Sequence, residues 1–251
     1  MKNDFGILDQ LIRSWAIVKK DMRIYYAKGQ VILMGILWPG FMFLSFAVGR
    51  QMSVDSLMPG LIGTTVFWTC SAISPIIFPV ESASRTLERL ASCPVSVWTI
   101  LLGDMLASAL TGLVVTIIPV AIALALGVSF TQPLVLLAGI ILSSLCFSSM
   151  ALIFSVPVTS SPAPIQMLST LIKFPLMFIS GIFVPLSQLP AVAKAISLIS
   201  PLTYFTEIAT YCMGGASYYP VSMSLLLLLM FTILFWVAAV SLHKRTLPKR
   251  L

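Results

Sequence analysis

The chain has 251 residues, of which 59% are hydrophobic and only 9% are charged, and its formal net charge is +7. About a quarter of the residues of a soluble domain are charged, so this composition excludes an ordinary soluble enzyme. It indicates a polytopic all-α membrane protein, with room for about six spans of about 20 residues and no second soluble domain. We interpret the basic excess as a sign of topology rather than of nucleic-acid binding.

Residues 1–28 are predicted to form an amphipathic helix on the membrane surface, although a solvated tail is an alternative. Apolar residues recur there close to helical spacing, and basic residues suited to anionic headgroups accompany them. The apolar positions are Leu8, Leu11, Ile12, Trp15, Val18 and Met22. A charged segment of this length before the first apolar run is not typical of a secretory signal.

Charged residues and helix breakers divide the following sequence into six predicted spans. No charged residue occurs between Met105 and Ile172, a stretch too long for one helix, so we place breaks at 127–133 and 156–164, where Gly and Pro gather. The predicted spans are 31–49, 57–80, 97–126, 134–154, 165–186 and 221–242. The whole chain, 1–251, is thus expected to be a single transmembrane domain.

The segment 187–219, between the last two predicted spans, is apolar in parts but too interrupted to cross a membrane. It contains Pro190, Lys194, Pro201 and Glu207. We expect two short re-entrant helices that enter the membrane from the outside, where packing against protein makes irregular backbone tolerable.

The distribution of Lys and Arg predicts the orientation. With six spans and the N-terminus inside, 12 of the 15 basic residues lie on the cytoplasmic side, two (Arg50 and Lys194) lie outside, and Lys173 lies within a span. Cytoplasmic loops collect Lys and Arg, so we expect both termini in the cytoplasm of a multi-pass inner-membrane protein.

Few residues suit covalent chemistry or metal binding. The sequence has no Gly-x-x-x-x-Gly-Lys-Ser/Thr loop for a nucleotide, and we expect no metal site, because the four cysteines lack metal or redox spacing and the single histidine, His243, lies at a membrane edge. An intramembrane serine protease would need a base near a buried serine, and Ser180 lacks the Gly-x-Ser context. Snorkelling or headgroup contact is the simpler expectation for His243.

The charged segment 81–95 joins the second and third predicted spans. Glu81, Arg85 and Glu88 are spaced to pair on one face of a helix, with leucines on the other face. A small apolar stripe inside a charged rim is typical of a helix that docks in a groove of another protein, but packing on the membrane surface would explain the same spacing.

Two motifs in this order resemble the type-2 ABC exporter permeases, nearest to the drug-resistance and antibiotic-exporter branch. The first is Glu81-x-x-x-x-Thr86-Leu87-Glu88-Arg89-Leu90-x-x-x-Pro94-Val95. The second runs from Phe174 to Leu186 and continues in Leu189-Pro190 and Ser200-Pro201-Leu202-Thr203-Tyr204. With the surface helix, the resemblance covers nearly the whole chain. In the family a Gly usually precedes the Thr of the first motif, where this chain has Arg85.

The resemblance implies a permease subunit that exports a hydrophobic or amphipathic compound and is not itself an enzyme. Two copies of a separate ABC ATP-binding subunit, which hold ATP and Mg, and a second permease, identical or different, would complete the exporter; this chain would carry no cofactor. The segment 81–95 would be the coupling helix. Its expected docking residues are Glu81, Arg85, Thr86, Leu87, Glu88, Arg89 and Leu90.

Residues of the fifth predicted span and the segment after it are candidates for the translocation path: Lys173, Pro175, Ser180, Gly181 and Glu207. A charge at membrane depth is costly and is usually paired or faces a watery path, although Lys173 could instead snorkel. An ion-coupled secondary transporter that works without an ATPase is the alternative function. It predicts polar residues inside several spans and internal repeats, and only Lys173 meets this expectation.

Overall fold

The computed structural model describes residues 7–50, 54–93, 95–184 and 186–247. Within these ranges the regular structure is entirely helical. The helices are α1 (Ile7–Asp21), the π-helical η1 (Met22–Tyr26), α2 (Gly29–Arg50), α3 (Val54–Cys70), α4 (Ser74–Ala83), α5 (Thr86–Ser92), α6 (Val97–Ala125), α7 (Pro133–Phe154), α8 (Pro162–Phe178), the 3-10 turn η2 (Leu186–Gln188), α9 (Ala191–Ser197), α10 (Pro201–Cys212) and α11 (Val221–Thr246).

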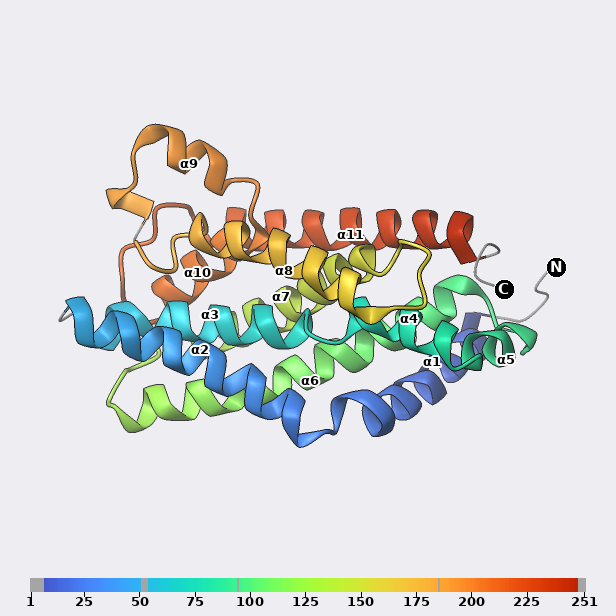
Figure 1. The fold of residues 1–251 in the computed structure, drawn as a ribbon. Helices are drawn as coiled ribbons and strands as arrows, with labels where there is room; N and C mark the ends of the chain where they lie inside the picture. Colours follow the sequence, from blue (N-terminus) through green and yellow to red (C-terminus); the bar gives the residue numbers. More distant parts are fainter. Residues whose placement is uncertain (1–6, 51–53, 94, 185, 248–251) are drawn as a thin grey trace.

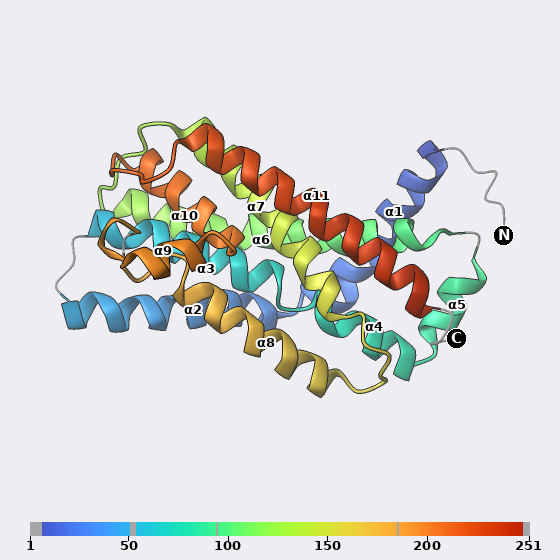
Figure 2. The ribbon, with the colours of Figure 1, turned by 90° about the horizontal axis from the view of Figure 1, so that it is seen from above.

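The long helices run along a common direction and form an elongated bundle (Figure 1). The short helix α5, the start of α1 and the end of α11 gather at one end, while α9 and α10 lie toward the other (Figures 1 and 2). We refer to these as the α5 end and the α9 end. This arrangement places the predicted cytoplasmic segments together.

Four helical stretches in the described part of the chain are long and apolar enough to cross a membrane: Ser56–Ala83, which combines α3 and α4, then α6, α7 and α11. Helix α2 contributes the shorter apolar stretch Gly35–Ser45, and α8 has 17 residues. An all-helical protein with several apolar spans is therefore confirmed, and the six-span topology stays a prediction.

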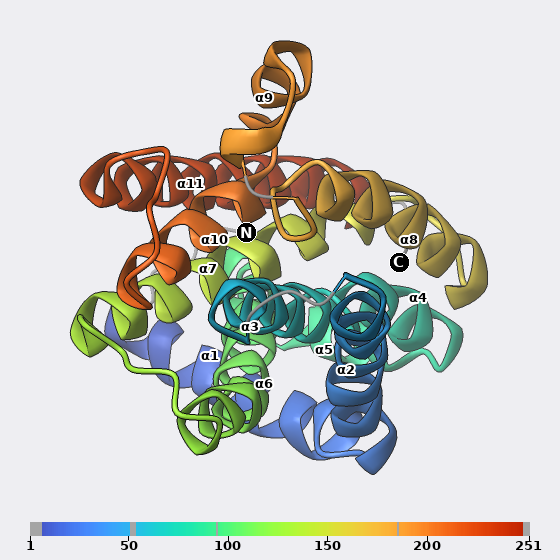
Figure 3. The ribbon, with the colours of Figure 1, turned by 90° about the vertical axis from the view of Figure 1, so that its left-hand side faces the viewer.

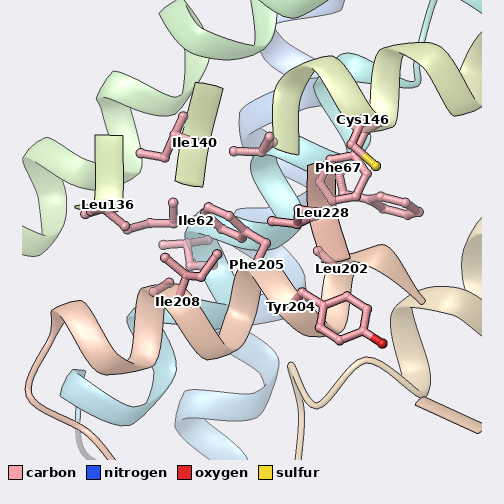
Figure 4. Packing of buried hydrophobic residues seen from close by; sticks show 14 of the residues in the cluster. Ile62, Phe67, Leu136, Ile140, Cys146, Leu202, Tyr204, Phe205, Ile208 and Leu228 are labelled. Atoms are coloured by element: carbon pink, nitrogen blue, oxygen red, sulfur yellow. The ribbon is translucent and has the colours of Figure 1, made fainter. Parts of the chain in front are cut away.

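The main core forms where α3 and α7 meet α6, α10 and α11. Phe67 of α3 and Phe147 of α7 meet edge to face at 5.0 Å. Phe205 of α10 is fully buried in the same cluster as Phe67 (Figure 4). Because α10 is inserted between the long helices, the segment after α8 is part of the core rather than a loose loop.

Two of the predicted spans differ from the helices observed. The span predicted at 57–80 is interrupted at 71–73, because Pro75 lacks the N–H that would continue the backbone hydrogen bonds. The span predicted at 165–186 ends as a helix at Phe178, and Gly181 then adopts a φ of +82°, which reverses the chain.

Helices α9 and α10 occupy the segment predicted to be re-entrant. Helix α10 is almost wholly buried, whereas α9 stands away from the bundle, as Figure 3 shows. Two short helices are therefore present, and their depth in a membrane stays a prediction.

Candidate functional site

The predicted coupling segment is a corner between two helices instead of one continuous helix. Arg85 has φ 55° and ψ 19°, and among the described residues it is the only one other than glycine with a positive φ. This left-handed turn ends α4 and begins α5. A glycine would adopt it without steric cost, which gives a physical reason for the Gly that the related family usually has here.

The position of Leu87 corrects the expected docking face. Leu87 is only 1% exposed, and Leu90 is half-buried, so the leucines do not form an exposed stripe. Leu87 belongs to an apolar cluster, here called the α5 socket, with residues from α1, α4, α6, α7 and α11: Ile17, Phe78, Ile100, Leu101, Met105, Leu152 and Ala239. Leu87 thus seats α5 in an apolar cluster to which five other helices contribute.

The outer face of the corner carries the remaining predicted docking residues. Arg85, Thr86, Glu88 and Arg89 are exposed, whereas Glu81 is only 3% exposed and faces inward. The hydroxyls of Ser84 and Thr86 lie 3.0 Å apart, and Thr86 also donates to the carbonyl of Glu81. The surface available to a partner is therefore polar and charged, and the tip holds its shape through local hydrogen bonds.

Glu81 pairs with Lys20 of α1 rather than with Arg85 as predicted. The Lys20 ammonium also lies 2.9 Å from Asp21. Burial alone would lower the pKa of Lys20, but the neighbouring carboxylates of Asp21 and Glu81 raise it above its ordinary value. Burial raises the pKa of Asp21 to about 6, because that side chain is almost fully desolvated while Lys20 stays partly exposed. The pair ties α1 to the base of the corner.

A second buried polar group joins η1, α4 and α6 next to this pair. The Tyr26 hydroxyl lies 2.9 Å from the Ser74 hydroxyl, and both donate to Oδ1 of Asp104, at 3.2 and 3.1 Å. Asp104 is 1% exposed. Asp104 thus holds three elements together through polar contacts.

Helix α1 turns a polar face to α6 and an apolar face outward. Ser14 donates to the carbonyls of Gln10 and Thr99, and the absence of a side chain at Gly103 permits the approach, since a Cβ there would lie 2.6 Å from Ile17 Cβ. On the opposite face Leu8 and Ile12 are 71% and 62% exposed. The predicted lipid-facing stripe of an interfacial helix is thus exposed at Leu8, Leu11, Ile12 and Trp15, whereas Val18 is buried and Met22 packs against the bundle.

Lys173 of α8 is fully buried inside the protein. Its Nζ donates to the backbone carbonyl of Ser71 at 3.1 Å and lies 4.6 Å from the centroid of the Trp68 ring. Both partners stand at the break between α3 and α4. The snorkelling alternative is therefore wrong for this lysine.

The other candidates for the translocation path lie near the end of α8 and in α10. Pro175 is exposed, whereas the Ser180 hydroxyl is buried and donates to Met177 at 2.6 Å. Gly181 makes the turn after α8. Glu207 accepts hydrogen bonds from the backbone N–H groups of Tyr218 and Tyr219, so it fixes the chain before α11. No single site brings the five residues together.

A small groove lies between α2, α3 and the turn after α8, with a volume of about 20 Å³, enough for about one water molecule. Its lining is almost entirely apolar: Pro39, Met42, Phe43, Leu57, Gly60, Leu61, Thr64, Ile182 and Phe183. Phe183 also contacts Phe178 at 5.2 Å between ring centroids, and Phe178 stacks on Phe174 at 6.4 Å. Phe174 in turn meets the rings of Trp38 and Trp68 edge to face.

His243 is buried inside the protein, so the expected snorkelling or headgroup contact is wrong. Its Nε2 lies 3.0 Å from the carbonyl of Leu152 and 3.1 Å from the Ser155 hydroxyl, and its ring packs on Phe78. These contacts cap the end of α7 and support the α5 socket. A serine and a histidine do meet here, but both are fully buried, so the pair gives no access to a peptide substrate.

Comparison with known proteins identifies the architecture. The model of the ABC-2 type transporter family matches residues 11–214, which include the corner, the groove and α10. The chain belongs to the ABC-2 type transporter family. It is also 27% identical over 215 residues to nodulation protein J of Rhizobium meliloti (strain 1021), an alignment that covers 82% of this chain and 80% of that protein.

Membership makes the chain a membrane subunit of an ABC transporter, with an ABC ATP-binding protein as its partner. The sequence had indicated the corner of this ABC-2 permease, but it missed the interior contacts that support it. The contacts between Lys20 and Glu81, and between Tyr26 and Asp104, join positions 61 and 78 residues apart. Helical spacing compares only near neighbours, so it held no signal for either contact.

Proposed function

We propose that this ABC-2 permease exports a hydrophobic or amphipathic compound across the inner cell membrane, driven by two copies of a separate ATPase. A second permease, identical or different, completes the pathway, and both termini lie in the cytoplasm. ATP and Mg are held by the partner ATPase, and this chain carries out no covalent chemistry.

One observation carries the proposal: the exposed corner is rigidly joined to the rest of the bundle. Its outer face presents Arg85, Glu88 and Arg89, its inner face inserts Leu87 into the α5 socket, and its base is tied to α1 by the pair of Glu81 and Lys20. A partner that displaces this corner therefore acts on α4, which leads into α5, and through the pair of Glu81 and Lys20 on α1. The corner could therefore pass a movement of the ATPase to the membrane helices, which is what ATP-driven alternating access requires.

The character of the groove supports the proposed class of cargo. Its walls carry no charged side chain, and the aromatic ring that Phe183 contacts is apolar as well. An apolar wall favours hydrophobic or amphipathic molecules over sugars or ions. We place the path along the groove and the end of α8, with Pro175, Ser180 and Gly181 at its border; Lys173 and Glu207 contribute through the backbone they hold.

Co-purification and transport in vesicles test the proposal. The permease should recover its ABC ATPase, and uptake of a lipophilic dye into inverted vesicles should require ATP. Arg89→Ala should weaken ATPase recovery about tenfold, whereas Lys244→Ala, which removes an exposed positive charge at the same end, should not. Transport that persists without any ATPase would refute the proposal and favour the ion-coupled alternative.

A further inference from the structure

The break between α3 and α4 leaves one backbone carbonyl without its helical partner. In an α-helix the N–H of residue 75 bonds the carbonyl of residue 71. Residue 75 is Pro, which has no N–H, so the Ser71 carbonyl loses that bond inside the protein. A buried carbonyl left unpaired is costly, so another donor must replace the missing one.

The side chain of Lys173 supplies that donor from a different helix. Its Nζ lies 3.1 Å from the Ser71 oxygen, and the ammonium stands over the Trp68 ring one turn earlier in α3. The adjacent Cys70 carbonyl is bonded by the Ser108 hydroxyl of α6 at 2.5 Å. The end of α3 is thus held from both sides, and a positive charge suits the negative end of a helix.

The contact between Lys173 and the Ser71 carbonyl lies at the break between α3 and α4, where it can set the orientation of α4. Helix α4 packs against α8 and leads directly into α5, which carries the exposed face of the corner. Any swing of α4 relative to α3 takes place at 71–73, where Ala72 bonds Thr69 only at 3.4 Å. The ammonium of Lys173 therefore fixes the angle at which α4 leaves α3.

We propose that Lys173 is a positioning residue: it replaces the N–H that Pro75 lacks, and so couples α8 to the hinge between α3 and α4. In this role Lys173 acts through the Ser71 carbonyl and does not bind cargo. The predicted effect on transport rests on the proposed function. The hinge is a property of the permease and can be tested without ATPase or cargo.

A suppressor experiment separates this role from direct binding of cargo. Lys173→Met removes the donor, and Pro75→Ala returns a backbone N–H opposite Ser71. ATP-driven transport should fall at least tenfold in Lys173→Met and return to within threefold of wild type in the double variant. The matched control is Pro79→Ala, at the second proline within α4. The N–H that this substitution introduces would face the carbonyl of residue 75 and not that of Ser71, so it should not restore transport to Lys173→Met. A cargo-binding lysine would not be rescued by Pro75→Ala, and that result would overturn the proposal.

A second readout needs neither ATPase nor cargo. In a Cys93→Ser background the remaining native cysteines are buried, so a cysteine introduced as Ala72→Cys reports the hinge. Its maleimide labelling rate in detergent should rise at least fivefold with Lys173→Met and fall back with Pro75→Ala. Unchanged labelling would refute the hinge role even if the permease still recruits its ATPase. If Lys173→Met does not fold, Lys173→Gln, which keeps one donor, should give an intermediate rate, and a rate equal to wild type would count against the proposal.

Discussion

The burial of Leu87 predicts that two neighbouring residues of α5 have opposite roles. Leu87→Ala removes the one fully buried side chain among those described in this seven-residue helix. Replacement of a buried Leu by Ala costs about 3 kcal/mol, and each 1.4 kcal/mol changes an equilibrium about tenfold. The population in which α5 has left the α5 socket should therefore rise on the order of 100-fold. Glu88→Ala, at an exposed position, should change this population little.

Hydrogen–deuterium exchange of the purified permease measures that population directly. Amides of α5 should exchange about 100-fold faster in Leu87→Ala and at the wild-type rate in Glu88→Ala. At saturating ATPase, Glu88→Ala should reduce recovery of the ATPase, whereas Leu87→Ala should recover as much ATPase as wild type. The reason is that Glu88 lies on the exposed face of α5 and Leu87 does not. Leu87→Met, which nearly conserves volume, should restore slow exchange. Wild-type exchange in Leu87→Ala would refute the idea that the α5 socket holds the corner.

Three further predictions concern the same end of the bundle. Lys20→Glu and Glu81→Lys should each destabilise the docking of α1 by about 2 kcal/mol, as limited proteolysis of α1 would show. The double variant should recover part of the loss, because it restores the pair between positions 20 and 81 but leaves two carboxylates at positions 20 and 21. Two purely additive losses would contradict the ion pair. Arg85→Gly should stabilise the corner by about 1 kcal/mol, because a residue with a Cβ is strained in the left-handed conformation that Arg85 adopts and glycine is not. Thermal unfolding measures this, and a lower unfolding temperature would argue against it. Burial raises the pKa of Asp21 to about 6, above its unfolded value of about 3.9, so its contribution to stability is present at low pH and lost as the pH rises through 6. Proteolysis of α1 should therefore be slower at pH 5 than at pH 7, and Asp21→Asn should remove that difference; an unchanged pH dependence in this variant would exclude Asp21 as its source.

The helical class could be predicted from the sequence because it depends on hydropathy and on where charges interrupt it. Hydropathy does not show whether an apolar stretch is one helix or two. The residues of α3 and α4 form a continuous apolar stretch, and the break at 71–73 arises from the backbone bond that Pro75 removes. The same holds for α8, whose end depends on the positive φ of Gly181 rather than on polarity.

The corner was located from its charges, but its inner and outer faces were assigned incorrectly. The prediction treated Glu81 to Leu90 as one helix, which places both leucines on one exposed face. The left-handed residue Arg85 rotates α5 relative to α4, so Leu87 turns into the bundle while Glu88 and Arg89 stay outside. One residue with a positive φ thus changes which side chains can meet a partner, and only the Gly usual in the family hinted at it.

Helix α4 is the element on which these contacts converge. Its 10 residues form a rod of about 15 Å between the break at 71–73 and the turn at Arg85. Near one end Lys173 of α8 holds the Ser71 carbonyl, and near the other Lys20 of α1 holds the Glu81 carboxylate. Each of these two cations belongs to a helix outside the rod. A displacement of α5 therefore cannot tilt α4 without straining a contact to α1, a contact to α8, or both. If the corner moves as proposed, α4 is the element through which that motion passes, and the contact to Ser71 gives the buried lysine of the otherwise uncharged helix α8 a structural role.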